Sequence, residues 1–268
     1  MNSARFISDM GKHAVVVNRV AETQWHAVED DLTIGRGHTS RRPDGRMFLS
    51  IDAWHGAAFD RLADTMLADL PKPLYTIADE ADLDLISQWE RAGFTIRRRE
   101  GEYLVPTDPR VTGLGSAPPP AGVTIVAVGR ARRGPLLTLD RLIREEVEAT
   151  VGWQEMPAEV LPRPDGAGAV DPSQYAVAAQ GDEYVGLLRV ATVLRQPRCR
   201  RIGLIAVRSG LRRRGVARAL LAHVLGSLHR CGIETASADV NESNRAAVAL
   251  FEGVGARRAG GNLELVLR

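Results

Sequence analysis

The sequence predicts an α/β protein with a mixed sheet, formed by two successive copies of one α/β unit. Short apolar runs alternate with segments whose apolar residues recur every three or four positions, as they do along one face of a helix. In the first half, Asp79 to Arg97 aligns at a constant offset with Asn241 to Ala259 in the second half. Both copies contain a strand, a loop and a helix in the same order, and a glycine ends each helix, at Gly93 and Gly255. Self-similarity of this kind indicates a repeated structural unit.

Size and composition are those of an ordinary globular protein. The chain has 268 residues, 44% of them hydrophobic and 25% charged, with a formal net charge of +2, which suits one large domain or two ordinary ones. We expect no signal peptide and no membrane span, because no apolar run has the required length. Cys199 and Cys231 are the only cysteines and do not have the spacing of metal ligands. These features predict a cytoplasmic protein with reduced thiols and no metal.

The first half is predicted to alternate strands with two helices. The helix at 57–70 has apolar residues at helical spacing and is stopped by Pro71 and Pro73. Residues 106–122 are dense in proline and glycine, which is typical of a semi-rigid linker. The expected elements are strands at 14–20, 25–34, 47–51 and 74–77, helices at 57–70 and 82–91, and a strand or hairpin at 94–105. We therefore divide the chain into a first domain (1–105), a linker (106–122) and a second domain (123–268).

The second half is predicted to hold more strands and longer helices. Residues 180–183 separate two apolar strands and form a hairpin turn. An irregular, proline-rich stretch is expected from 152 to 172. The expected elements are strands at 123–128, 175–179, 184–193, 200–207, 235–240 and 263–267, and helices at 136–147, 216–231 and 244–254.

One loop of the second half predicts an anion site. Arg212-Arg213-Arg214-Gly215-Val216-Ala217 lies between a buried strand and an amphipathic helix. The first N–H groups of a helix have no partner within it and carry its positive end, so they can bind an anion such as a phosphate. Gly215 lets the backbone approach a ligand closely. Neither the Gly-x-Gly-x-x-Gly fingerprint nor the Gly-Lys-(Ser/Thr) ending of a P-loop is present. The alternative is a solvated, arginine-rich helix start.

The spacing Arg212-x-x-Gly215-x-Ala217 resembles the (Arg/Gln)-x-x-Gly-x-(Gly/Ala) pyrophosphate loop of the GNAT superfamily of acyl-CoA-dependent N-acetyltransferases. The segment from Asn241 to Phe251 is similar to a second motif of that family, Asn-x-x-Ala-x-x-Leu-Tyr. The order of elements over 123–268 resembles the complete GNAT topology, and the tandem arrangement resembles that of mycothiol synthase and related two-module GNAT proteins. The corresponding loop of the first half, residues 50–56, is short and contains Asp52. The resemblance therefore implies two GNAT-like modules, of which the first is degenerate.

The resemblance also implies a site for acetyl-CoA. The fourth and fifth strands of the second module would splay apart, and acetyl-CoA would lie in the gap. The backbone of Ile205, Ala206 and Val207 would pair with the pantetheine arm. The pyrophosphate would be held by Arg212, Arg213, Arg214, Gly215, Val216, Ala217 and Arg218. Asn244 would meet the pantetheine or cap the following helix, and Trp153 would either line the acceptor pocket or anchor the core.

The family transfers the acyl group directly to a neutral amine, with a base to accept the proton and an acid to protonate the thiolate. The acid is usually the tyrosine of the second motif, where this chain has Phe251; water, a backbone donor, Tyr175 or Tyr184 are alternatives. The strand at 200–207 lacks the usual carboxylate base, and Glu155 is our first candidate. The other groups left open are Glu146, Asp182, Glu183, Asp239, His223 and His229.

Three functions follow. The first is an N-acetyltransferase that moves an acetyl group from acetyl-CoA to a primary amine of a small molecule or protein, as a monomer or homodimer without nucleic-acid or membrane partners. The second is a non-catalytic acyl-CoA-binding or regulatory protein, indicated by Phe251 and by the missing strand carboxylate. The third is a nucleic-acid binder that uses the arginines, which the nearly neutral net charge disfavours.

Overall fold

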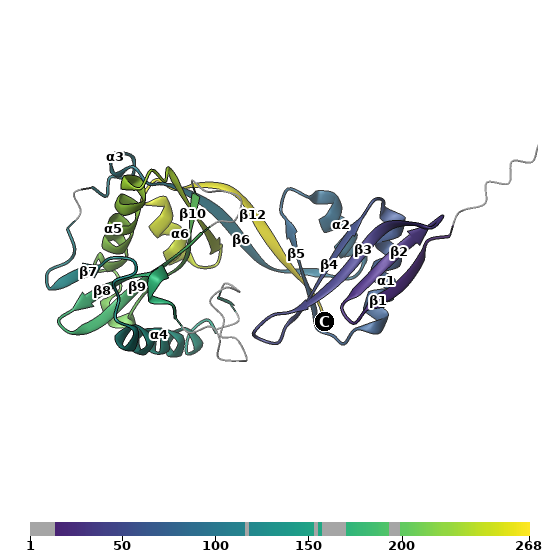
Figure 1. The fold of residues 1–268 in the computed structure, drawn as a ribbon, viewed down its shortest axis with the longest axis horizontal. Coiled ribbons are helices and arrows are strands. Elements are labelled where there is room, and N and C mark those ends of the chain that lie inside the picture. The colour runs from purple at the N-terminus through teal and green to yellow at the C-terminus, as the bar shows by residue number, and fades with distance from the viewer. Residues whose placement is uncertain (1–13, 116–117, 153–154, 157–169, 193–198) are drawn as a thin grey trace, which may run out of the picture.

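A computed structural model describes residues 14–115, 118–152, 155–156, 170–192 and 199–268 (Figure 1). The first half contains β1 (Val16–Ala21), β2 (Gln24–Glu29), β3 (Leu32–Arg41), β4 (Met47–Ala53), α1 (Gly56–Asp69), β5 (Leu74–Asp79), α2 (Leu83–Arg91) and β6 (Thr95–Pro106). The second half contains α3 (Pro109–Thr112), β7 (Val123–Val126), α4 (Arg133–Glu148), η3 (Pro172–Gln174), β8 (Tyr175–Gln180), β9 (Glu183–Thr192), β10 (Cys199–Val207), η4 (Ser209–Leu211), α5 (Val216–Arg230), β11 (Thr235–Asn241), α6 (Arg245–Glu252) and β12 (Arg257–Leu267).

Most predicted elements are present, and two differ. The strand expected at 25–34 is a hairpin of β2 and β3, because Asp30 and Asp31 adopt positive φ angles of 50° and 64° that form a tight turn, and aspartate tolerates this conformation better than most residues. Residues 94–105, expected to form a strand or a hairpin, contain one strand. The last strand begins at Arg257 and not at residue 263, because its glycine-rich first half pairs with β6.

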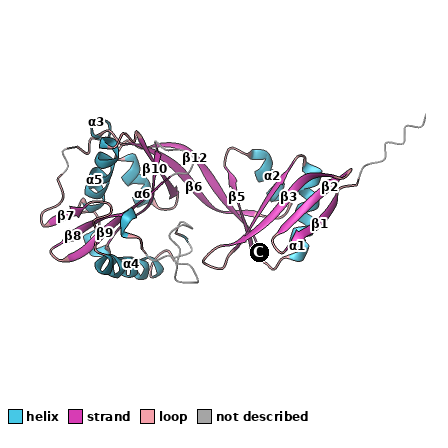
Figure 2. Cartoon of the chain, viewed as in Figure 1, coloured by secondary structure: helices cyan, strands magenta, loops and turns pink. Residues whose placement is uncertain are grey.

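The described strands form one mixed sheet (Figure 2). Their order is β1-β2-β3-β4-β5-β12-β6-β11-β10-β9-β8-β7. Two neighbouring pairs are parallel, β4 with β5 and β10 with β11, and the others are antiparallel. The predicted α/β class with a mixed sheet is therefore confirmed.

The two halves exchange their last strands. β6, from the first half, lies between β11 and β12, and β12, from the end of the chain, lies between β5 and β6. In Figure 1 these two strands form the long ribbon that joins the halves. Each half therefore needs a strand from the other to complete its part of the sheet.

Each exchanged strand contributes buried residues to the core of the other half. In the first half, α1 and α2 pack on one face of the sheet, in a cluster that includes Leu263 and Leu265 from β12. In the second half, the cluster under α5 and α6 includes Tyr103 and Val105 from β6. A third cluster lies between α4 and the opposite face of the second half. Fully burying a large apolar side chain contributes roughly 1.5–3 kcal/mol, so the exchanged strands contribute directly to both cores.

The first part of the expected linker is packed against the second half. The buried hydroxyl of Thr107 donates to the carbonyl oxygens of Ile233 and Glu234, just before β11. The short helix α3 contacts α5, and Leu114 is buried in the same core. These contacts explain why residues 106–115 have an ordered course despite their proline and glycine content.

Candidate functional site

The parallel strands β10 and β11 pair only at their beginnings. The last pair is Arg201 with Ser237, although both strands continue beyond it. At the same point β10 contains a β-bulge, because its register against β9 shifts between Ile202 and Leu204, and a bulge bends its strand. β10 and β11 therefore diverge, as the resemblance implies for the fourth and fifth strands.

The predicted pantetheine-binding residues lie on this free edge of β10. On its other edge β10 remains paired with β9 through Ile205, Ala206 and Val207. Backbone polar groups of a strand project to its two edges, and those not bonded to β9 point into the opening towards β11. They are available to an extended chain of amide groups.

The predicted anion loop joins the end of β10 to the start of α5. Arg213 and Gly215 both have positive φ angles, 58° and 87°, and successive residues of alternating handedness turn their N–H groups into one concavity. Gly215 is also the N-cap of α5, and no side chain caps this helix. The first N–H groups of α5 are therefore left for a ligand or for water.

The arginine that begins the motif is held by the protein itself. Nε of Arg212 donates to the carbonyl oxygen of Val207 at 3.1 Å, and its Nη2 lies 3.5 Å from Oε2 of Glu146 on α4. The same carboxylate accepts from Nε of Arg208 at 2.7 Å and from the N–H of Ser209 at 2.8 Å. Glu146 thus fixes both sides of the turn that leads into the loop.

The environment of Glu146 argues against its use as a base. Burial raises the pKa of its carboxyl, but the hydrogen bonds from Arg208 and Ser209 outweigh burial and leave the pKa below its usual value. A carboxylate that prefers to stay ionised and bonded is a weak proton acceptor at neutral pH. The sequence alone could not reveal this role, because α4 and the loop are far apart along the chain.

Glu155 lies against the exchanged strand β6 and the end of β11. Its carboxylate forms an ion pair with Arg97, and its Oε2 accepts from Nδ2 of Asn241 at 3.4 Å. Its backbone carbonyl accepts from Nη1 of Arg98 at 2.9 Å. Glu155 is thereby attached to a strand of the first half. Trp153 lies outside the described residues.

A β-bulge places the two arginines on one face. Glu264 of β12 pairs with Arg98, and Leu265 pairs with Ile96, so Arg97 is an extra residue in the ladder. Instead of pointing to opposite faces, Arg97 and Arg98 both reach Glu264, with N–O distances of 2.6 and 3.6 Å. Glu264 is only 3% exposed, and it is compensated by these cations.

The second motif contributes mainly to packing and capping. Oδ1 of Asn244 accepts from the N–H of Ala247 at 3.1 Å, so the side chain caps α6. Phe251 is 2% exposed and stacks on Tyr103, with ring centroids 6.4 Å apart. The partner of Phe251 therefore comes from the first half, which no local sequence pattern could show.

Of the other candidate groups, Tyr184 and Asp239 have structural partners and Tyr175 is buried. The hydroxyl of Tyr184 accepts from the N–H of Arg132 at the start of α4, at 3.0 Å. Tyr175 is buried in the cluster under α4, and burial raises the pKa of its hydroxyl. Asp239 forms an ion pair with Arg201 where β10 and β11 begin to diverge.

In the first half, the corresponding gap between β4 and β5 is bridged by a hydrogen bond, and the helix that follows is capped by a side chain. β4 and β5 also pair only at their beginnings, but the hydroxyl of Thr76 donates to the carbonyl oxygen of Leu49 across the two strands at 3.0 Å. Only Trp54 and His55 separate β4 from α1. Nδ1 of His55 accepts from the N–H of Ala58 at 3.2 Å and caps α1.

Comparison with known proteins gives the same assignment for the second half. Residues 139–256 match the acetyltransferase (GNAT) family. No curated protein matches the chain in sequence.

Solved structures match nearly the whole chain. A GCN5-related N-acetyltransferase from Sphaerobacter thermophilus is 15% identical, with a TM-score of 0.60 over 93% of this chain and 82% of the other. A tandem GNAT protein from the clavulanic acid biosynthesis pathway is 13% identical, with a TM-score of 0.62 over 91% and 82%. A GNAT-family acetyltransferase from Colwellia psychrerythraea is 12% identical, with a TM-score of 0.60 over 91% and 85%. The GNAT fold predicted from the motifs is therefore confirmed.

Candidate metal clusters and membrane-spanning helices are both absent from the described part of the chain. There, no group of three or more His, Cys, Asp or Glu side chains could hold a metal ion. No helix of that part is long and apolar enough to cross a membrane.

Proposed function

We propose that this chain is an acyl-CoA-dependent N-acyltransferase that moves an acetyl group from acetyl-CoA to a primary amine by direct transfer. The observation that carries the proposal is that β10 and β11 diverge at the point where β10 leads to the uncapped start of α5. An unpaired strand edge and a cluster of free N–H groups suit the two parts of coenzyme A, its amide-containing arm and its pyrophosphate. Acetyl-CoA supplies the activated thioester.

The chain contributes to donor binding mostly through its backbone. The free edge of β10 at 205–207 receives the pantetheine arm, and the N–H groups around Gly215 and Val216 receive the pyrophosphate. Arg212 acts indirectly, because its guanidinium is already bonded to Val207 and Glu146. Arg213 and Arg214 are exposed, so their charges assist mainly at low ionic strength.

The acceptor is proposed to reach the thioester on the side of Glu155 and Trp153. Glu155 is the candidate base, and its carboxylate lies beside Arg97 and Asn241. Phe251 cannot donate a proton, and in the core it packs against Tyr103. The departing thiolate is then proposed to take its proton from water, with a backbone donor, Tyr184 or Tyr175 as alternatives.

The first half is proposed to be a degenerate module in a tandem arrangement like that of mycothiol synthase. Two observations support this proposal. Thr76 bridges the strands where the pantetheine arm would enter, and His55 accepts from the N–H of Ala58, one of the groups at the helix start that would meet a pyrophosphate.

A second candidate is a protein that binds acyl-CoA without transferring the acyl group. Phe251 and the engagement of Glu155 by Arg97 and Asn241 favour it. Release of free thiol from acetyl-CoA, measured with a panel of amines, separates the two. We expect amine-dependent thiol release in the parent and a rate of release lower by roughly 100-fold or more in Glu155→Gln. In Glu145→Gln the rate is expected to change little, because Glu145 is exposed; it adjoins Glu146, which supports the anion loop. Binding of acetyl-CoA without thiol release supports the second candidate, and absence of binding contradicts both.

A further inference from the structure

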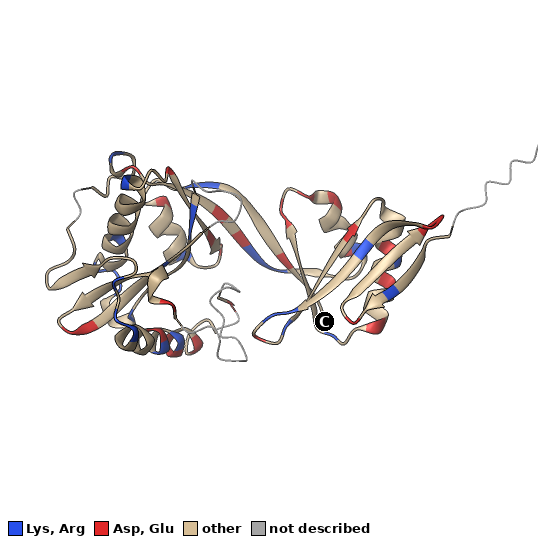
Figure 3. Cartoon of the chain, viewed as in Figure 1, with Lys and Arg blue, Asp and Glu red and all other residues tan. Residues whose placement is uncertain are grey.

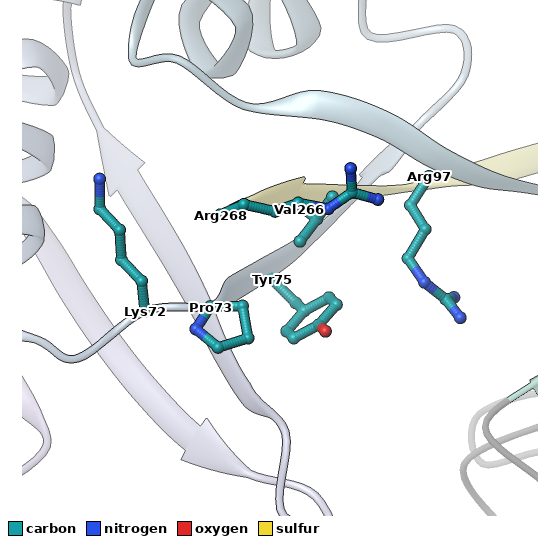
Figure 4. A pocket seen from close by; sticks show the side chains of 6 residues that line it. All are labelled: Lys72, Pro73, Tyr75, Arg97, Val266 and Arg268. Atoms are coloured by element: carbon teal, nitrogen blue, oxygen red, sulfur yellow. The ribbon is translucent and has the colours of Figure 1, made fainter.

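The first half has two adjoining cavities on the face of the sheet opposite α1 and α2. Each has a volume of about 360 Å³, and they share Lys72, Pro73 and Tyr75, so we call them the Tyr75 cavities. One is completed by Arg97, Val266 and Arg268 (Figure 4). The other is completed by the β3–β4 turn and the chain before Lys72, namely Arg41, Asp44, Gly45, Arg46, Met47 and Pro71. Together they reach the size of ordinary small-molecule sites.

These cavities exist because one layer of the fold is missing. In the second half, α4 covers this face with an apolar cluster. In the first half, β1 is followed directly by β2, and no helix lies between them. Leu74 and Ala78 of β5 face the core under α1 and α2, and neighbouring strand residues alternate between faces, so Tyr75 points to the uncovered side.

Arginine side chains lie over two aromatic rings, the buried Phe48 and the half-buried Tyr75. Tyr75 stacks on Phe48, with ring centroids 5.4 Å apart. The guanidinium of Arg42 lies 3.6 Å from the centroid of Phe48, and that of Arg46 lies 5.2 Å from the centroid of Tyr75. The cavities are therefore lined by one aromatic ring, that of Tyr75, with cations at its edge, a combination that suits planar anionic groups.

The buried and half-buried arginines of this surface are paired with carboxylates, but exposed basic residues at the mouth of the cavities have no such partner in the described part of the chain. Arg46 pairs with Asp44 and Glu264, and Arg97 pairs with Glu264 and Glu155. Lys72 and Arg41 are exposed.

Neither Lys72 nor Arg41 has a carboxylate partner among the residues that the structure describes. Figure 3 shows basic residues along the β3–β4 turn. A concave site with uncompensated positive charge concentrates anions.

We propose that the Tyr75 cavities are a binding site for a small molecule with carboxylate or phosphate groups. Lys72, Arg41 and Arg268 meet its negative charges, and the Tyr75 ring with Pro73 supports its uncharged part. Arg46 and Arg97, already neutralised, hold the shape of the site. This site is separate from the proposed donor site, and it gives the first half a binding function of its own.

The test is a calorimetric titration of the full chain with citrate and with inorganic pyrophosphate. The titrations are done with the parent and with the Gly215→Glu variant. In this variant the anion loop of the second half is blocked, so binding that remains cannot come from that loop. The charge reversal Lys72→Glu is compared with Arg61→Glu, which makes the same charge change on the exposed side of α1.

We expect saturable binding that Lys72→Glu weakens roughly ten-fold or more and Arg61→Glu leaves within about two-fold, since only the former adds a charge at the cavity mouth. The affinity is expected to fall as salt is added. The proposal is overturned if neither anion binds saturably to the parent or to a folded Gly215→Glu variant, or if Lys72→Glu weakens binding no more than Arg61→Glu does. Neither result depends on acyl transfer, so the proposal can fail while the proposed function stands.

Discussion

Glu100 of β6 and Asn262 of β12 lie opposite each other, and each is the counterpart of the other in the internal repeat. The pairs on either side, Gly101 with Gly261 and Arg99 with Leu263, are exchanged by the same correspondence. A local two-fold axis therefore passes between these strands. The repeat seen in the sequence is thus a symmetry of the structure, and the exchanged strands lie at its centre.

Close packing at this axis predicts that Gly261→Ala destabilises the protein. A Cβ at residue 261 would lie 2.5 Å from the backbone oxygen of Glu100 and 2.9 Å from side-chain atoms of Arg258 and Glu80. Because a backbone atom cannot move aside cheaply, we expect a loss of about 1–3 kcal/mol in the free energy of unfolding. Gly260→Ala is the matched control, since nothing lies within 4 Å of its Cβ.

Denaturant unfolding of both variants measures the difference. Gly260→Ala is expected to stay within about 0.5 kcal/mol of the parent. Equal stability of the two variants would contradict the close approach of β6 and β12.

The strand exchange predicts that residues 123–268 do not form a stable domain alone. This fragment lacks β6, so the edge of β11 is exposed and the core under α5 and α6 loses Tyr103, Val105 and Leu114. At roughly 1.5–3 kcal/mol for each large side chain, the loss is comparable with the whole stability of a domain, about 5–15 kcal/mol. We expect the fragment to aggregate or to unfold without cooperativity in a thermal melt.

A fragment of residues 95–268 keeps β6 and α3 and serves as the control. It is expected to be more soluble and to melt at a higher temperature. Identical behaviour of the two fragments would show that the second half does not need the exchanged strand.

The support of the anion loop predicts that Glu146→Gln weakens acetyl-CoA binding. The substitution removes the charge that holds Arg208 and Arg212, and a hydrogen bond to a charged group contributes about 1.5–3 kcal/mol. Part of this is lost to solvent screening, so we expect a fall in affinity of roughly five- to ten-fold. Glu145→Gln, on the exposed side of the same helix, is expected to bind as the parent does. Calorimetry with acetyl-CoA distinguishes them.

The same contact predicts a pH dependence of stability. The pKa of Glu146 is lowered in the folded protein, so its contribution is fully present above the unfolded value, about 4.3, and is lost as the pH falls through the lower folded value. The difference in unfolding free energy between the parent and Glu146→Gln is expected to be constant from about pH 8 to pH 5.5 and to shrink below about pH 4.3. A difference that already shrinks between pH 8 and 6 would contradict this assignment.

The sequence predicted the elements well where local pattern determines them. The strand before Arg212, the helix after Gly215 and the cap at Asn244 all follow from periodicity and from the chemistry of helix ends. The strand from Arg257 was recognised only in part, because a glycine-rich edge has no apolar alternation. Its partner could not be predicted, since alternation shows that a segment is a strand and not which strand lies beside it.

The sequence predicts the parts of the candidate site that the backbone forms, but not the side-chain contacts that hold them. The anion loop follows from Gly215 and its neighbours, but the support by Glu146 joins α4 to a loop that is distant in sequence. Arg97 is brought to the face of Arg98 by a bulge, which a residue count along one strand cannot reveal. The Tyr75 cavities are present because the first half lacks a helix on that face of the sheet. They can therefore be recognised only once the folded sheet is known.

The central claim is that coenzyme A binds where β10 and β11 diverge and α5 begins. The most direct measurement is a thermal shift with acetyl-CoA on the parent, on Gly215→Glu and on Gly134→Glu, which adds the same charge at an open position in α4. A ligand that binds only the folded state raises the melting temperature. We predict a concentration-dependent rise for the parent and for Gly134→Glu, and none for a folded Gly215→Glu. No rise in the parent, or an equal rise in all three proteins, would contradict the claim.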